Sequence, residues 1–164
     1  MAFLVRLAEA IANAFAYIAT GVIVVLTLHV CVDVGSRYLF NLPLPGTTEM
    51  VAKYYMVGAV FLPLAYCQLH RQHFNATLFE AYLPRTLIRR MDAVHDLVMC
   101  LLAGLYAYCT GLAAYDATMI GERVQTAFYP LLTWPSRWLV PIGAGVLCVV
   151  AALQFIISFR REPE

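Results

Sequence analysis

The chain has 164 residues, of which 62% are hydrophobic and only 13% are charged, and its formal net charge at pH 7 is +1. Soluble domains carry about 25% charged residues, so this composition excludes an ordinary soluble protein and indicates a membrane protein. The basic residues are spread along the chain and form no single patch, which argues against a nucleic-acid partner.

Four long segments of the sequence lack charged side chains, and each is close to the roughly 20 residues that cross a bilayer core as a helix. We therefore predict an all-α membrane protein with four transmembrane helices, at about residues 8–37, 48–69, 90–120 and 135–159. The first helix is expected to be retained, because it is long enough to span and no small-residue cleavage site follows it. Residues 1–164 are thus expected to form one transmembrane domain.

Basic residues predict the orientation of these helices. Seven arginines fall on one side of the predicted bundle and four basic residues on the other, which favours both termini in the cytoplasm. The cytoplasmic group is Arg6, Arg71, Arg85, Arg89, Arg90, Arg160 and Arg161, and the external group is Arg37, Lys53, Arg123 and Arg137.

The connection between the first two helices, residues 33–49, is the most specific part of the sequence. It combines charged residues with a turn built from Pro43, Pro45 and Gly46, so the chain leaves the bilayer, reverses and re-enters. Glu49 then stands at a helix start, where the helix dipole favours negative charge. This corner is expected to be a shaped contact surface.

Two opposite charges flank the turn of this corner. We expect Arg37 and Glu49 to pair across it and to hold the two helix ends together, with a stabilisation of about 0 to 1 kcal/mol for a near-surface pair. Lys53 stands four residues after Glu49 in the favourable order and is a competing partner.

The connection between helices two and three carries an amphipathic pattern. Phe74, Leu78 and Tyr82 recur at helical spacing, and Pro84 would end a helix there. A short helix over residues 74–84 that lies in the cytoplasmic membrane interface is one interpretation. A helix that packs on its own bundle is the other.

Three further features concern how the helices are placed. Pro63 is expected to kink the second helix. Pro135 suits the first turn of the fourth helix, and Trp134 belongs to an interfacial aromatic belt that also includes Tyr129 and Trp138. Small residues on helices two and three offer positions for close helix approach, namely Gly58, Ala59, Ala103, Gly104, Ala107, Gly111 and Ala114.

The depth of the ionisable residues bears on function. A coupled carrier needs a carboxylate near the bilayer midplane, whereas the carboxylates of this chain are predicted at helix ends: Asp33, Glu49 and Asp116 outside, and Asp92 and Asp96 inside. The five cysteines are expected to act as small hydrophobic residues. We therefore expect no enzyme activity and no catalytic, metal, cofactor or substrate site in this chain.

A haem-binding anchor of a respiratory electron-transfer complex is the alternative. Four-helix membrane cytochromes ligate haem between histidines on different helices. His29 and His95 differ in predicted depth by roughly 20 Å at 1.5 Å per residue, so one iron cannot bridge them. A single haem at the cytoplasmic edge, ligated by His95 together with His70 or His73, remains an alternative.

The corner carries a resemblance to a known family. The pattern Asp33-x3-Arg37-Tyr-x-Phe-Asn41-x-Pro43-x-x-Gly46-Thr-x-Glu49 resembles that of the small membrane subunit (DctQ family) of TRAP transporters, the tripartite ATP-independent periplasmic transporters. His73 ahead of Leu83-Pro84, and the stretch from Trp134-Pro135 to Gly143, are similar to the family as well. The family usually has an aspartate four residues after the histidine, where this chain has Thr77.

The resemblance implies a sodium-coupled importer of organic acids in the bacterial inner membrane. In such a complex a periplasmic substrate-binding protein delivers substrate, and a large membrane subunit moves it by an elevator motion and binds the Na⁺. The small subunit is implied to scaffold the large one, among membrane lipids, and to help form the docking surface for the binding protein. The interface candidates are Asp33, Arg37, Asn41, Pro43, Gly46, Glu49, Lys53, His73, Trp134 and Arg137.

Overall fold

A computed structural model describes residues 2–42, 44–70, 85–125 and 130–160 of the chain. Four of its helical segments are long and apolar enough to cross a membrane, and they are Val5–Phe40, Thr47–Leu69, Arg90–Met119 and Trp134–Ile157. The prediction of an all-α membrane protein with four spans is confirmed. The expected interfacial segment at 74–84 and His73 lie outside the described residues, as does Pro43.

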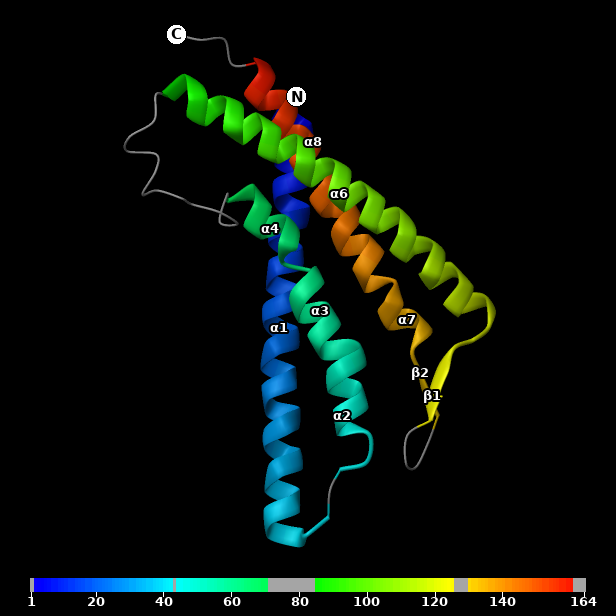
Figure 1. Cartoon of the computed structure of the whole chain (residues 1–164). Helices are drawn as coiled ribbons and strands as arrows, with labels where there is room; N and C mark the ends of the chain where they lie inside the picture. Colours follow the sequence, from blue (N-terminus) through cyan, green and yellow to red (C-terminus); the bar gives the residue numbers. More distant parts are fainter. Residues whose placement is uncertain (1, 43, 71–84, 126–129, 161–164) are drawn as a thin grey trace.

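The first span is a single helix, α1 (Ala2–Phe40), of 39 residues. At 1.5 Å per residue it is about 58 Å long, and a hydrocarbon core is only about 30 Å thick. Helix α1 therefore projects beyond the core. It ends at the corner, which lies at the opposite end of the molecule from the two chain termini (Figure 1).

The second span is divided into four pieces. It runs through α2 (Thr47–Met50), the π-helical turn η1 (Val51–Tyr55), α3 (Met56–Phe61) and α4 (Leu64–Leu69). The expected break occurs at Pro63, because proline has no backbone N–H to continue the helical ladder and its ring clashes with the preceding turn. The π-helical turn has no counterpart in the sequence prediction.

The third and fourth spans are joined by a short hairpin. Helix α6 (Arg85–Met119) leads into β1 (Arg123–Gln125), which pairs antiparallel with β2 (Pro130–Leu132) so that Val124 faces Leu131. Helices α7 (Trp134–Arg137) and α8 (Leu139–Arg160) then complete the fourth span. The sequence analysis predicted no strands in this connection.

The closest packing joins α8 to α6 and α3. Helices α6 and α8 lie side by side along much of their length (Figure 1). A Cβ atom added at Gly104 would touch the Cys148 sulfur at 3.4 Å, and one added at Gly143 would overlap the backbone carbonyl of Phe61. Small residues therefore allow close helix approach in this part of the molecule.

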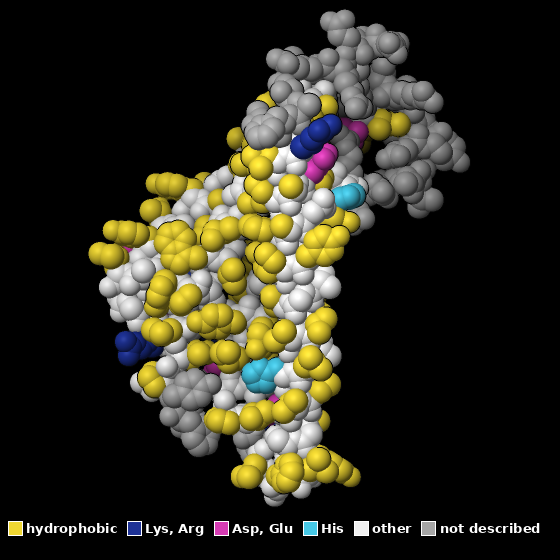
Figure 2. Space-filling model, turned by 180° about the vertical axis from the view of Figure 1, so that it is seen from behind, with side chains coloured by type: hydrophobic (Ala, Val, Ile, Leu, Met, Phe, Trp, Pro, Cys, Tyr) yellow, Lys and Arg dark blue, Asp and Glu magenta, His cyan; other side chains and the backbone are white. Residues whose placement is uncertain are grey.

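The outer surface of the bundle is apolar. Hydrophobic side chains cover most of the middle of the face drawn in Figure 2, and charged side chains are few on it. Helix α1 contributes many exposed large residues, including Tyr17, Val24 and Leu28. Such a surface is suited to lipid tails or to another membrane protein rather than to water.

Candidate functional site

The outer corner is organised around a buried carboxylate. Asp33 is 5% exposed and lies near the end of α1. Its Oδ1 accepts the backbone N–H of Leu44 at 2.9 Å, and its Oδ2 lies 2.9 Å from Nη2 of Arg37, one helical turn further along. Charge-assisted contacts of this kind are stronger than neutral ones, so Asp33 fastens the returning loop to α1.

The expected pair between Arg37 and Glu49 is not formed. Arg37 pairs with Asp33 instead, because these two residues stand at i and i+4 on one rigid helix. Among the described residues, neither Glu49 nor Lys53 has an ion-pair partner. A π-helical turn, Val51–Tyr55, begins between Glu49 and Lys53, and such a turn has a wider repeat than the α-helix on which the i, i+4 pairing was based.

The turn itself uses two left-handed residues. Asn41 has φ of 55° and Gly46 has φ of 81°. Asparagine tolerates this region because its side chain is short and polar, and glycine enters it freely. The Gly46 carbonyl then accepts the N–H of Met50 at 2.9 Å and opens α2. The sequence-predicted residues Asn41 and Gly46 are thus turn formers, next to the Asp33 anchor.

A second ordered region at the same end of the molecule is the hairpin connection. Arg137 holds Glu122 through two contacts, Nη2 to Oε1 at 2.7 Å and Nε to Oε2 at 2.6 Å. The hydroxyl of Tyr54 donates to the carbonyl of Leu132 and so ties the hairpin to the second span. Arg137 therefore has a structural partner that the sequence analysis did not identify.

The tryptophans of this region occupy different environments. Trp134 is half-buried and begins α7, with Pro135 in the first turn as expected. Trp138 is exposed, and its indole Nε1 donates to Thr118 Oγ1 at 3.0 Å. An amphipathic ring with its N–H satisfied is typical of a residue near a membrane interface.

The structure also shows a buried polar cluster that the sequence analysis missed. Gln68 of α4 donates through Nε2 to Asp96 Oδ1 of α6 at 3.1 Å and to Gln154 Oε1 of α8 at 2.9 Å. Gln154 Nε2 in turn lies 3.1 Å from the carbonyl of Gln68 and 3.2 Å from that of Leu69. The Gln154 side-chain amide thus supplies a donor for the last backbone carbonyls of α4, which lack a partner within the helix.

Asp96 lies deeper than a helix end. It is 2% exposed and, at 1.5 Å per residue, about 9 Å along the helix from Arg90, where the apolar span begins. The sequence did contain a signal for this polar cluster. Gln68 and Gln154 lie in otherwise apolar helices, and polar side chains within membrane spans often hydrogen-bond across helices.

The described histidines are held at separate places. His29 Nδ1 lies 3.2 Å from the Tyr55 hydroxyl, His70 Nδ1 lies 3.0 Å from the Tyr66 carbonyl, and His95 Nδ1 lies 3.9 Å from Asp96 Oδ1. Within the described part of the chain, no group of three or more histidine, cysteine or acidic residues is placed to share a metal ion.

Two cysteines meet inside the bundle. The sulfurs of Cys100 on α6 and Cys148 on α8 lie 3.7 Å apart, and Cys148 Sγ lies 3.4 Å from the Cys100 carbonyl. All five cysteines are free thiols. This pair fills the α6–α8 contact as two small, weakly polar side chains.

Comparison with known proteins gives one match. The family model for the DctQ component of tripartite ATP-independent periplasmic transporters matches residues 26–161. This range contains the outer corner, the hairpin connection and the buried polar cluster. No curated protein and no solved structure matches the chain.

Proposed function

Because this chain belongs to the family of the DctQ component of tripartite ATP-independent periplasmic (TRAP) transporters, we propose that it is the small permease subunit that scaffolds a large transport subunit. A TRAP transporter component is a transporter protein rather than a member of an enzyme family. The alternative expectation, a haem-binding respiratory anchor, gains no support from this family match.

The observation that carries the proposed scaffold role is the exposure of α1. Only 6% of the residues in its most apolar 18-residue window are buried by the rest of the chain. Helices in a bilayer associate through close packing and hydrogen bonds, not through a hydrophobic force, so a helix this open is free to pack against a partner. We propose that the large subunit covers part of this surface.

The proposed orientation follows from the two ends of the molecule. Both termini lie at one end, and the corner and the hairpin lie at the other (Figure 1). With both termini in the cytoplasm of a bacterial inner membrane, as the arginine distribution favours, the corner and the hairpin face the periplasm. They are then placed to meet a substrate-binding protein.

Within this external end, some charged residues form ion pairs with one another and others do not. Asp33, Arg37, Glu122 and Arg137 are paired with one another and hold the fold. Glu49 and Lys53, which have no ion-pair partner among the described residues, remain available for contacts with another protein. We therefore assign the proposed docking role to Glu49 and Lys53 rather than to Arg37.

The proposed transport chemistry belongs to the other subunits. The complex is proposed to be a sodium symporter for organic acids, with the Na⁺ and substrate sites in the large subunit. Three of the described carboxylates support that division, because Asp33 and Glu122 are engaged in ion pairs and Asp96 accepts a hydrogen bond from Gln68.

An uptake assay tests the proposal. Cells that express all three components should take up a labelled organic acid in the presence of Na⁺, and removal of this chain should abolish the uptake. Lys53→Glu should lower uptake by weakening docking, while Lys53→Arg should leave it near the original rate. Full uptake without this chain would contradict the proposed role.

A further inference from the structure

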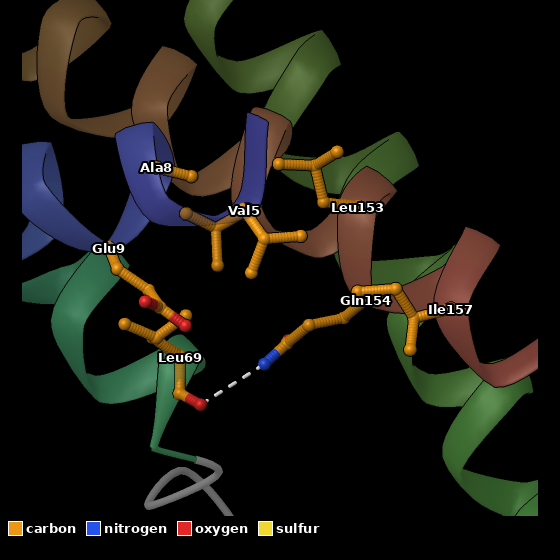
Figure 3. A pocket seen from close by; sticks show the side chains of 8 residues that line it. Val5, Ala8, Glu9, Leu69, Leu153, Gln154 and Ile157 are labelled. Atoms are coloured by element: carbon orange, nitrogen blue, oxygen red, sulfur yellow. Dashed lines mark hydrogen bonds between the residues drawn. The ribbon is translucent and has the colours of Figure 1, made fainter. Parts of the chain in front are cut away.

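A cleft opens at the end of the molecule where the two termini lie. It has a volume of about 200 Å³ and is enclosed by α1, α4 and α8 (Figure 3). Most of its wall is apolar, and the apolar lining residues are Val5, Ala8, Leu69, Val150, Leu153 and Ile157. The cleft is separate from the corner and the hairpin to which the proposed docking role is assigned.

Two polar side chains line the same cleft, and only one of them is satisfied. Gln154 reaches across to the end of α4, where its Nε2 lies 3.2 Å from the Leu69 carbonyl (Figure 3). Glu9 is exposed on α1 and, within the described part of the chain, its carboxylate has no hydrogen-bond or ion-pair partner. The cleft therefore combines apolar walls with one negative charge.

The position of Glu9 along α1 bears on what this carboxylate can contact. Glu9 lies four residues inside the candidate span that begins at Val5. Because α1 is longer than a hydrocarbon core, this position near its start is suited to the headgroup region, where a carboxylate can meet a cationic headgroup. Arg6, one helical turn earlier, is exposed and forms no ion pair with Glu9. The described residues thus leave the Glu9 carboxylate without a counter-charge.

We propose that this cleft binds a phospholipid whose headgroup carries a primary ammonium, as in phosphatidylethanolamine. One acyl segment lies against the apolar walls, the ammonium contacts the Glu9 carboxylate, and the phosphate is on the side of Arg6. A primary ammonium offers three N–H donors to a carboxylate, whereas the quaternary ammonium of a choline headgroup offers none.

The headgroup, not the tail, decides the selectivity of this site. Lipid tails are as apolar as the lining residues, so a tail gains little by leaving the bilayer for the cleft. It does fill a space whose lining atoms would otherwise lack contacts. An anionic glycerol headgroup brings no cation to Glu9. The inference goes beyond the proposed function and holds whether or not the corner docks a binding protein.

Lipid retention measures this preference. The full chain, purified in mild detergent with the subunits that accompany it, is equilibrated with equal amounts of phosphatidylethanolamine, phosphatidylcholine and phosphatidylglycerol of matched acyl chains. Native mass spectrometry then counts the retained lipids. We expect about fivefold more phosphatidylethanolamine than phosphatidylcholine, the ratio that the net contribution of one hydrogen bond supports.

Three variants locate the effect. Glu9→Gln should bring the two lipids close to parity by lowering the retention of phosphatidylethanolamine. Asp116→Asn, which changes an exposed carboxylate near the C-terminal end of α6, should keep the preference. Val5→Trp, which fills the cleft, should lower retention of all three lipids. Circular dichroism confirms that each variant keeps its helices.

Several results would overturn the inference. They are equal retention of the three lipids by the unaltered protein, a preference that survives Glu9→Gln, a preference for phosphatidylglycerol, or retention that Val5→Trp leaves unchanged. The last of these would mean that the retained lipids bind elsewhere on the surface.

Discussion

Helices α8 and α1 are both long and apolar, yet the chain uses them differently. In the most apolar window of α8, 28% of the residues are buried, against 6% in that of α1. Helix α8 packs against α6 along much of its length and also contacts α4 and α3, whereas α1 contacts the second span and α8 but leaves most of its large side chains exposed. Helix α8 thus belongs to the protein's own core, and α1 mainly presents a surface.

The side chains explain this difference. The buried residues of α8 recur at one face of the helix and are mostly small, namely Gly143, Ala144, Leu147, Val150 and Ala151. On α1 the buried apolar residues are three alanines of its first half, Ala8, Ala12 and Ala19. The outer half of α1 is fastened through His29 and Asp33 instead.

The largest expected effect comes from Gly143, where α8 approaches α3. Gly143→Ala places a Cβ against the backbone carbonyl of Phe61, which cannot turn aside as a flexible side chain would. We expect a loss of about 3 kcal/mol in the free energy of unfolding, or failure to accumulate in the membrane. Gly145→Ala, which has nothing within 4 Å, is the control. Equal thermal stability of the two variants in detergent would show that the α8–α3 contact is looser than described.

The next effect concerns the anchor that holds α1 to the corner. Asp33→Ala leaves the Leu44 N–H without its acceptor and Arg37 without its partner. We expect a loss of about 2 to 3 kcal/mol, measured by thermal unfolding in detergent. The exposed Asp116→Ala should change stability little. An Asp33 variant as stable as that control would remove the corner from the features that support the fold.

A smaller effect is expected for the buried polar cluster. Gln154→Leu removes the hydrogen bonds between α8 and the end of α4, and we expect a cost of about 1 kcal/mol, since such bonds contribute modestly in membranes. A double-mutant cycle with Gln68→Leu should show that the two losses are not additive, because the two amides bond to each other. Strictly additive losses would contradict a connected cluster.

The smallest effect on stability is expected on the open face of α1. Val24→Ala and Leu28→Ala each remove exposed side chains, so the unfolding free energy of the purified chain should change by less than about 0.5 kcal/mol. The same variants should reduce the amount of large subunit that co-purifies. Destabilisation as large as that of Asp33→Ala would mean that α1 is packed within the chain after all.

Much of the fold follows from local patterns in the sequence. Gaps between charged residues predicted four spans, Pro63 predicted the break in the second span, and Pro135 predicted the first turn of the fourth. Gly104 and Gly111 were expected to allow close approach, and Cβ atoms added there would meet Cys148 and Pro141. These features depend on neighbouring residues or on helix periodicity, which the sequence displays directly.

The contacts of the candidate site were harder to predict, because they depend on which helices meet. By charge alone, Arg37 could pair with either Asp33 or Glu49. It pairs with Asp33, because the two residues stand at i and i+4 on one helix and Asp33 is buried there. A π-helical turn, which the sequence did not predict, begins between Glu49 and Lys53. The polar cluster joins Gln68, Asp96 and Gln154 from three helices, and no local pattern links these positions.

Photo-crosslinking from α1 tests the scaffold role most directly. A photoreactive residue at Leu28, which is 61% exposed, is activated in native membranes, with one at Val150, buried within the bundle, as the comparison. The account predicts one adduct between this chain and a single larger, polytopic membrane protein from position 28 and no such adduct from position 150. Adducts with lipid alone from position 28, repeated at other exposed positions of α1, would contradict it.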